Sequence, residues 1–247
     1  MKVRADQLAV EQGLCESRTL AQRLIMAGQI RLGPDTPVKK PGQMLDAAVQ
    51  LMLIAPPQYV SRGAFKLLGA LDEYKPETAG IVALDLGAST GGFTDLLLQR
   101  GAAKVYAVDV GYGQLHDKLR RDSRVISLER TNARDLTREI IPEEIDMLVG
   151  DVSFISLTKV LPPCVPFLRK GAWIMVLVKP QFECERHEVG SGGVVRDEAV
   201  RQRCVEKIVS FSESELGWKG VGVVPSPILG PKGNQEFIAV FRNGQQE

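Results

Sequence analysis

The sequence predicts an α/β protein in which a mostly parallel, helix-covered sheet follows a small N-terminal α+β unit. From Tyr59 onward, apolar segments of strand length alternate with amphipathic segments of helix length, which is typical of a parallel sheet with helical crossovers. The last two strand-like segments have no helix between them and are therefore expected to be antiparallel neighbours. A chain of 247 residues has room for this sheet and a second, smaller domain.

The N-terminal unit is predicted to span residues 1–54. Ser17 is a candidate N-cap before apolar residues at helical spacing, and Gly28 is expected to end that helix. Short strands are expected at residues 29–32 and 49–54, with a turn-rich stretch between them.

A proline-rich segment follows this unit. The prolines of Ala55-Pro56-Pro57-Gln58 fix the backbone and remove amide donors, so residues 55–60 are predicted to form a linker. The domain at 61–247 is then expected to hold a seven-stranded sheet with an antiparallel last strand. The predicted strands are 81–86, 104–109, 124–129, 145–151, 172–178, 219–224 and 236–241, and the predicted helices include 93–100, 115–121 and 197–216.

Composition and charge exclude several classes of protein. With 44% hydrophobic and 25% charged residues, the chain is neither disordered nor fibrous. A net charge of +1 neither requires nor excludes a polyanionic partner. The four cysteines form no C-x-x-C pair, so no metal site is expected. The N-terminus lacks the apolar core of a secretory signal, and the longest apolar run, 172–178, is too short for a bilayer. A cytoplasmic protein without membrane insertion is predicted.

A glycine-rich turn follows the first strand of the sheet domain, in the sequence Asp85-Leu86-Gly87-Ala88-Ser89-Thr90-Gly91-Gly92-Phe93. Glycine lets the backbone come close to a ligand, and Asp85 ends its strand where α/β sheets bind ligands. Asp109 ends the next strand. In nucleotide-binding sites, an acidic residue at this position binds the ribose diol. The G-x-x-x-G-G spacing and the antiparallel ending favour S-adenosylmethionine over a nicotinamide dinucleotide.

The adenine end of this cofactor has two candidate partners after the third strand, Asn132 and Asp135. A plain helix N-cap is an equally good interpretation of Asp135. The cofactor contacts expected from the sequence are Asp85, Gly87, Ala88, Ser89, Gly91, Gly92, Phe93, Asp109, Asn132 and Asp151.

Four ionisable residues, Lys66, Asp151, Lys179 and Glu236, lie at the ends of predicted elements, where they are expected to converge. The chain resembles the hemolysin A (TlyA) family through Ser61-Arg62-Gly63 and residues 85–93, 109–112, 129–132, 151–157, 179–183, 226–227 and 233–237. This resemblance implies a Rossmann-like class I S-adenosylmethionine-dependent methyltransferase with an FtsJ-like catalytic domain. It also implies a Lys-Asp-Lys-Glu tetrad at these four positions, and ribose 2'-hydroxyls of ribosomal RNA as the methyl acceptors.

A ribose hydroxyl is a poor nucleophile, so a base is useful in such a reaction. Lys179 is the candidate base, because a desolvated lysine beside a second cation, here Lys66, loses its proton near neutral pH. Asp151 and Glu236 are expected to hold the two ammonium groups.

The N-terminal unit resembles the RNA-binding domain named after ribosomal protein S4, through residues 4–8, 17–18, 27–30 and 39–42. That domain usually carries a Val-Asn-Gly-type turn where this chain has residues 31–35, so the hairpin is expected to differ. The candidate RNA-binding residues are Arg4, Arg18, Arg23, Lys39, Lys40 and Arg62. The alternative is an ordinary solvated charged surface.

The predicted function is S-adenosylmethionine-dependent methylation of a ribose 2'-hydroxyl, that of a cytidine, in small-subunit ribosomal RNA, large-subunit ribosomal RNA or both. Residues 181–195 contain three glycines and indicate either a substrate loop that orders on RNA or a plain surface connection. The alternative functions are a hemolysin that acts on membranes without methyl transfer and a nicotinamide-dependent oxidoreductase. The oxidoreductase would leave the four ionisable residues without a role.

Overall fold

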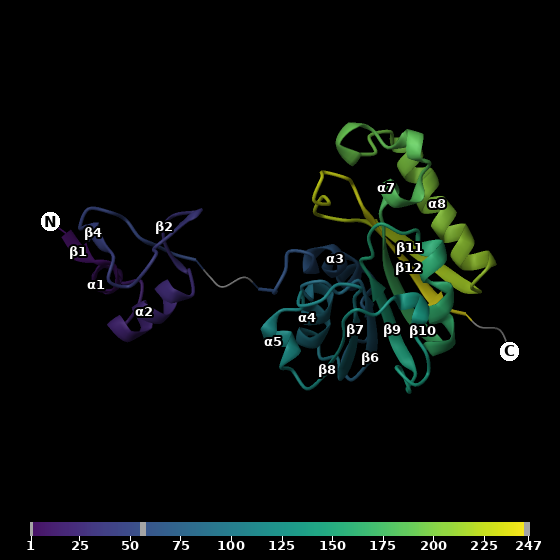
Figure 1. Ribbon diagram of the computed structural model, residues 1–247, viewed down its shortest axis with the longest axis horizontal. Coiled ribbons are helices and arrows are strands. Elements are labelled where there is room, and N and C mark those ends of the chain that lie inside the picture. Colours follow the sequence, from purple (N-terminus) through teal and green to yellow (C-terminus); the bar gives the residue numbers. More distant parts are fainter. Residues whose placement is uncertain (1, 55–57, 245–247) are drawn as a thin grey trace. The chain divides into compact units, whose positions relative to one another are not determined.

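The computed structural model describes residues 2–54 and 58–244, which form two compact units that divide between Gln58 and Tyr59 (Figure 1). Residues 55–57 of the predicted linker lie outside the described residues. Tyr59 and Val60 also belong to the predicted linker, but they pack in the core of the second unit. We therefore propose that the second domain begins at Tyr59 rather than at Ser61.

The first unit is a small α+β fold with two helices and two short sheets. Its elements are β1 (Lys2–Arg4), α1 (Ala5–Glu11), α2 (Arg18–Met26), β2 (Ile30–Gly33), β3 (Thr36–Pro37), β4 (Met44–Asp46) and β5 (Met52–Leu53). Strand β1 pairs with β4, and β2 pairs with both β3 and β5, all antiparallel. Leu8, Ala21, Ile25, Ile30 and Leu45 are buried in its core.

The predicted N-cap of the first unit is confirmed, because the Ser17 hydroxyl accepts a hydrogen bond from the Leu20 amide at 3.2 Å. Strands lie at both predicted places, although β5 has only two residues. The β2–β3 hairpin turns at Pro34 and Asp35 and has an irregular register. Strands β1 and β4 have three residues each, and so short a run carries no recognisable alternation.

The second unit is built on a seven-stranded sheet of order β11-β12-β10-β9-β6-β7-β8. Its strands are β6 (Val82–Leu86), β7 (Lys104–Val108), β8 (Val125–Leu128), β9 (Ile145–Gly150), β10 (Leu168–Val178), β11 (Trp218–Pro225) and β12 (Phe237–Asn243). Strands β6 to β10 pair in parallel, whereas β12 lies antiparallel between β10 and β11. The predicted mostly parallel sheet with an antiparallel last strand is thus confirmed.

Helices cover both faces of this sheet (Figure 1). They are α3 (Ala64–Tyr74), α4 (Gly92–Gln99), α5 (Asp117–Arg120), α6 (Leu157–Val160), α7 (Pro180–Glu183) and α8 (Glu198–Ser214). Leu67, Leu96 and Leu119 of α3, α4 and α5 pack on one face, while α6 and α8 pack on the other. The predicted helix at 115–121 has only the single turn α5, and a 3₁₀ turn, η1 (Ala133–Asp135), follows β8. Regular βαβ alternation was therefore the wrong expectation for this half of the sheet.

Candidate active site

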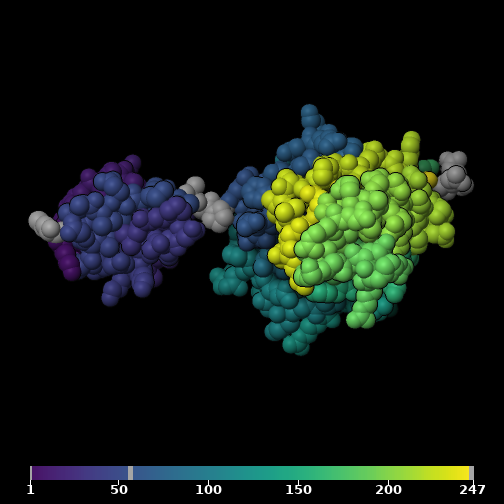
Figure 2. Space-filling view, turned by 90° about the horizontal axis from the view of Figure 1, so that it is seen from above, coloured from purple at the N-terminus to yellow at the C-terminus, as the bar shows by residue number. Residues whose placement is uncertain are grey.

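A cavity of about 1120 Å³ opens at the carboxyl ends of β6, β9 and β10. Its wall includes the glycine-rich turn, the start of α3, the residues after β9 and β10, and a loop before β12. In Figure 2, green segments that follow β10 lie against yellow segments that precede β12 on the surface of this unit. Asn234 joins the two, since it accepts from the Val195 amide at 2.9 Å and donates to the Gly193 carbonyl at 2.8 Å.

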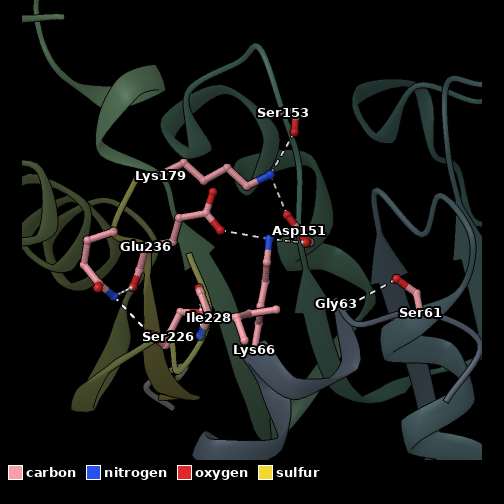
Figure 3. A network of polar contacts seen from close by, with 10 residues as sticks. Ser61, Gly63, Lys66, Asp151, Ser153, Lys179, Ser226, Ile228 and Glu236 are labelled. Atoms are coloured by element: carbon pink, nitrogen blue, oxygen red, sulfur yellow. Dashed lines mark hydrogen bonds and ion pairs between the residues drawn. The ribbon is translucent and has the colours of Figure 1, made fainter. Parts of the chain in front are cut away.

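The structure brings the four predicted ionisable residues together inside this cavity (Figure 3). The Lys66 ammonium lies 3.1 Å from Asp151 Oδ2 and 2.8 Å from Glu236 Oε2. The Lys179 ammonium lies 2.5 Å from Asp151 Oδ1. Asp151 therefore bridges the two lysines, and the four side chains form one continuous network.

Burial and charge differ around the two lysines of this network. Burial acts to lower the pKa of Lys66, but the carboxylates of Asp151 and Glu236 outweigh it, and the net effect raises the pKa above its ordinary value. Lys66 is thus a permanent cation at neutral pH. Within the described part of the chain, Lys179 contacts one carboxylate, that of Asp151, which it shares with Lys66, and it donates to the Ser153 hydroxyl at 2.8 Å.

The glycines of the turn are explained by packing within the protein, a reason that differs from the predicted close approach of a ligand. A Cβ at Gly87 would lie 2.8 Å from the Asp151 carbonyl oxygen, and the residue has φ of 76°. A Cβ at Gly91 would lie 2.2 Å from Leu119 Cδ1, with φ of 94°. The Gly87 amide donates to the Val108 carbonyl at 2.9 Å, so it is engaged with the sheet.

Gly91→Ala is expected to lower the free energy of unfolding by about 3 kcal/mol, because the new methyl group meets Leu119 and the left-handed backbone is strained. Gly113→Ala is the matched control: φ there is 69°, but nothing lies within 4 Å of the added Cβ, so a loss of about 1 kcal/mol is expected. Urea unfolding of both variants measures the difference. Equal losses would contradict the packing explanation.

Asp85 lies beneath the turn and lines the cavity, with its side chain fully buried. Its Oδ2 accepts a hydrogen bond from the Thr94 hydroxyl at 2.6 Å, whereas its Oδ1 has no hydrogen-bond partner among residues 2–54 and 58–244. Burial raises the pKa of Asp85 to about 7, against the hydrogen bond from Thr94, which acts to lower it. An unsatisfied buried oxygen of this kind is suited to a cationic ligand group.

Asp109 and Asn132 are engaged with nearby backbone amides and are not in the wall of the cavity. Asp109 accepts from the Ser89 amide through Oδ2 and from the Gly111 amide through Oδ1, both at 2.7 Å. Asn132 accepts from the Arg134 amide at 3.0 Å and caps η1. The interpretation of Asp135 as the N-cap is therefore wrong, because Asn132 holds that position. Of the other predicted cofactor contacts, Gly87, Ala88, Ser89, Gly92 and Phe93 line the cavity and Gly91 does not.

Two residues at or near this site had no separate indication in the sequence. Phe154 has φ of 65°, is 90% exposed, and lies 5.1 Å from Phe182, ring centre to ring centre. Glu183 is buried and accepts from the Ser156 hydroxyl at 2.5 Å and from the Leu157 amide at 2.8 Å. Both lie inside motifs that also contain Asp151 or Lys179, so the motifs themselves were the available signal.

The candidate RNA-binding residues are all exposed at the surface. Arg4 and Arg18 both bind the buried carboxylate of Asp6, at 2.9 and 3.2 Å. Arg23, Lys39 and Lys40 are exposed elsewhere on the first unit, while Arg62 lines the cavity of the second unit. Asp6 thus fixes two of these guanidinium groups.

Comparison with known proteins shows which protein families the two units match. The family model described as FtsJ-like methyltransferase matches residues 59–243, and the S4 domain model matches residues 3–50. The 16S/23S rRNA (cytidine-2'-O)-methyltransferase TlyA of Mycobacterium tuberculosis is 48% identical over 98% of this chain and 90% of its own length. Hemolysin A of Brachyspira hyodysenteriae is 41% identical over 97% of this chain and 99% of its own length.

A solved structure points the same way. A protein described as a hemolysin from Streptococcus thermophilus superposes with a TM-score of 0.75 and 40% identity, covering 99% of this chain and 90% of that chain. Across residues 2–54 and 58–244, no helix is both long and apolar enough to cross a membrane. The nicotinamide-dependent alternative is wrong, because the catalytic unit matches a methyltransferase family throughout. The chain belongs to the hemolysin A (TlyA) family, in which an S4 domain precedes an FtsJ-like methyltransferase domain.

Proposed function

We propose that this chain transfers the methyl group of S-adenosylmethionine to the 2'-hydroxyl of a cytidine in ribosomal RNA. The observation that carries this proposal is the network of Lys66, Asp151, Lys179 and Glu236, which lies in one cavity with the glycine-rich turn. The name of the Mycobacterium tuberculosis relative, a cytidine-2'-O-methyltransferase, supports it.

The cofactor is proposed to lie along the turn from Asp85 to Phe93. S-adenosylmethionine, when bound, supplies a methyl group on a positively charged sulfur. The unsatisfied Oδ1 of Asp85 fits the cofactor's ammonium group, and the carboxylate of Asp151, whose backbone lies against Gly87, adds negative charge near the same end of the turn. Asp109 is proposed to receive the ribose diol from the outer side of the turn, with Asn132 near the adenine.

The two lysines are proposed to have different roles. Lys66 is held by two carboxylates and remains an ammonium that orients Asp151 and Glu236. Lys179 has fewer anionic contacts, so its Nζ is the group that takes the proton of the 2'-hydroxyl as the oxygen attacks the methyl carbon. A buried base held in one position favours the in-line geometry that this substitution needs.

RNA binding is proposed for the S4 unit through Arg4, Arg18, Arg23, Lys39 and Lys40, and for the cavity mouth through Arg62. The ribosomal subunit is the proposed form of the substrate, and the cytoplasm is the proposed place of the reaction. The segment 181–195 is proposed to contact RNA, since Gly193 lies in the cavity wall.

Transfer of labelled methyl groups to purified small and large ribosomal subunits tests this proposal. We expect a ribose-methylated cytidine when the modified nucleotide is mapped. A methylated base would contradict the role given to the four ionisable residues, and no transfer to either subunit or to the free RNA would contradict the proposed function.

A further inference from the structure

Ser153 contacts Lys179, whereas Lys66 is held by the carboxylates of the network (Figure 3). The Lys179 Nζ donates to Ser153 Oγ at 2.8 Å, whereas Lys66 is held by Asp151 and Glu236. Lys179 is buried, with 8% of its side chain exposed, and Ser153 is exposed at the cavity mouth. The hydroxyl therefore lies on the solvent side of the proposed base.

The other described partners of Lys179 favour its charged form. An ionised carboxylate accepts hydrogen bonds and donates none, so Asp151 can hold an ammonium but cannot donate to an amine. The ring of Phe182, 6.0 Å from Nζ, likewise attracts a cation. A serine hydroxyl can both accept and donate, since its proton rotates. Among these described partners, Ser153 is the one that suits both the ammonium and the amine.

The charged groups around Lys179 come from three other places in the fold: Asp151 directly follows β9, Lys66 lies in α3, and Glu236 directly precedes β12. Asp151 accepts a hydrogen bond from Lys66 and forms an ion pair with Lys179, so its carboxylate stabilises the cationic form of both lysines. When Lys179 loses its proton, its contact with Asp151 loses the attraction between opposite charges, whereas the contact with Ser153 keeps a hydrogen bond in either protonation state.

The position of Ser153 is fixed from both sides. Asp151, two residues before it, is held by the two lysines. The far end of the same loop is held by the buried Glu183, which accepts from Ser156 Oγ and from the Leu157 amide. Between these ends the backbone adopts a left-handed conformation at Phe154, with φ of 65°. Such a conformation in a non-glycine residue is uncommon and is kept where the surroundings enforce it.

We propose that Ser153 is a positioning residue that holds Lys179 in place both before and after proton transfer. This inference rests on the proposed function. Before the reaction, the Ser153 O–H donates to the Lys179 amine. The 2'-O–H bond then breaks, its proton joins Nζ, and the oxygen bonds to the methyl carbon as the carbon–sulfur bond breaks with its electron pair on sulfur. The Ser153 hydroxyl rotates and accepts from the new ammonium.

The test compares Ser153→Ala with Ser153→Thr in the full chain, with Ser214→Ala, an exposed serine at the end of α8, as the control. Rates are measured against pH with ribosomal subunits and S-adenosylmethionine at saturation. We expect Ser153→Ala to lower kcat about tenfold, as the loss of one hydrogen bond implies, with KM changed less than about twofold. The pH of half-maximal rate should shift, because the hydroxyl contacts both the ammonium and the amine and the two contacts differ in strength. Threonine, which keeps the hydroxyl, should restore both values.

If the wild type is active and Ser153→Ala has the same rate and pH profile as the wild type, this inference is overturned but the proposed function is not. A lower rate with an unmoved pH profile, which is what a purely structural role produces, would overturn it as well. A threonine variant as impaired as the alanine variant would also overturn it. A wild type that transfers no methyl group to ribosomal RNA would overturn the proposed function, and this inference with it.

Discussion

Lys179→Ala is expected to lower the rate of methyl transfer by about 10³-fold while S-adenosylmethionine still binds. General-base catalysis contributes about 10² to 10⁴-fold in enzymes, and this substitution removes the only group that we assign to proton abstraction. Lys179 is buried and contacts Asp151 and Ser153, whereas the cofactor is proposed to be held by the glycine-rich turn and by the unsatisfied oxygen of Asp85. The variant should therefore lose turnover while it keeps its affinity for the cofactor.

Lys179→Arg sharpens this test, because arginine keeps the positive charge but does not lose its proton at accessible pH. Single-turnover transfer to ribosomal subunits gives the rate, and calorimetry gives the affinity for S-adenosylmethionine. Lys219→Ala, at an exposed position of β11, is the control for the loss of a surface lysine. A Lys179→Arg variant with the wild-type rate would show that charge, and not proton transfer, is what Lys179 provides.

Asp85→Asn is expected to stabilise the cofactor-free protein at pH 8 while it weakens cofactor binding. Burial raises the pKa of the Asp85 carboxyl to about 7 in the folded chain, compared with about 4 in an unfolded one. Folding then takes up a proton between these values, so wild-type stability is complete below about pH 4 and is lost as the pH rises through about 7. At about 1.4 kcal/mol for each of some three pH units, the gain for Asn reaches up to about 4 kcal/mol.

Binding of the cofactor should show the opposite trend for Asp85. The ionised carboxylate pairs with the ammonium of S-adenosylmethionine, so wild-type affinity should rise with pH through about 7. Asp85→Asn should lose on the order of 100-fold in affinity, the value of a hydrogen bond to a charged group. Urea unfolding and calorimetry across pH measure both effects, with Asp35→Asn in an exposed turn as the control. A variant that binds as tightly as wild type would contradict the role of Asp85.

The sheet of the catalytic unit was predictable because its signals are local. Each central strand is an apolar run bounded by glycine or a charged residue, and the Pro-rich return before β12 excludes a helical crossover. Helix α3 carried a weaker signal, since Gly69 interrupts its interior. The single turn of α5 has no apolar repeat to distinguish it from the longer helix that the sequence indicates at 115–121.

Much of the site depends on contacts between segments that are far apart in sequence. Motifs could place the four ionisable residues at strand and helix ends. They could not show that Asp151 bridges both lysines. The same holds for the glycines, since the atoms that exclude a Cβ at Gly91 belong to Leu115 and Leu119. Propensity and spacing within one segment carry no information on such contacts.

The backbone of Asp151 also fixes the geometry of the site. Its carboxylate holds both lysines, its amide donates to the Leu86 carbonyl at 2.9 Å, and its carbonyl oxygen is the atom that leaves no room for a Cβ at Gly87. One residue therefore sets the separation between the turn proposed to bind the methyl donor and the lysines proposed to act on the ribose hydroxyl. Any displacement of this strand end moves both sides of the reaction together, so the alignment of oxygen, carbon and sulfur is insulated from small movements of the surrounding loops.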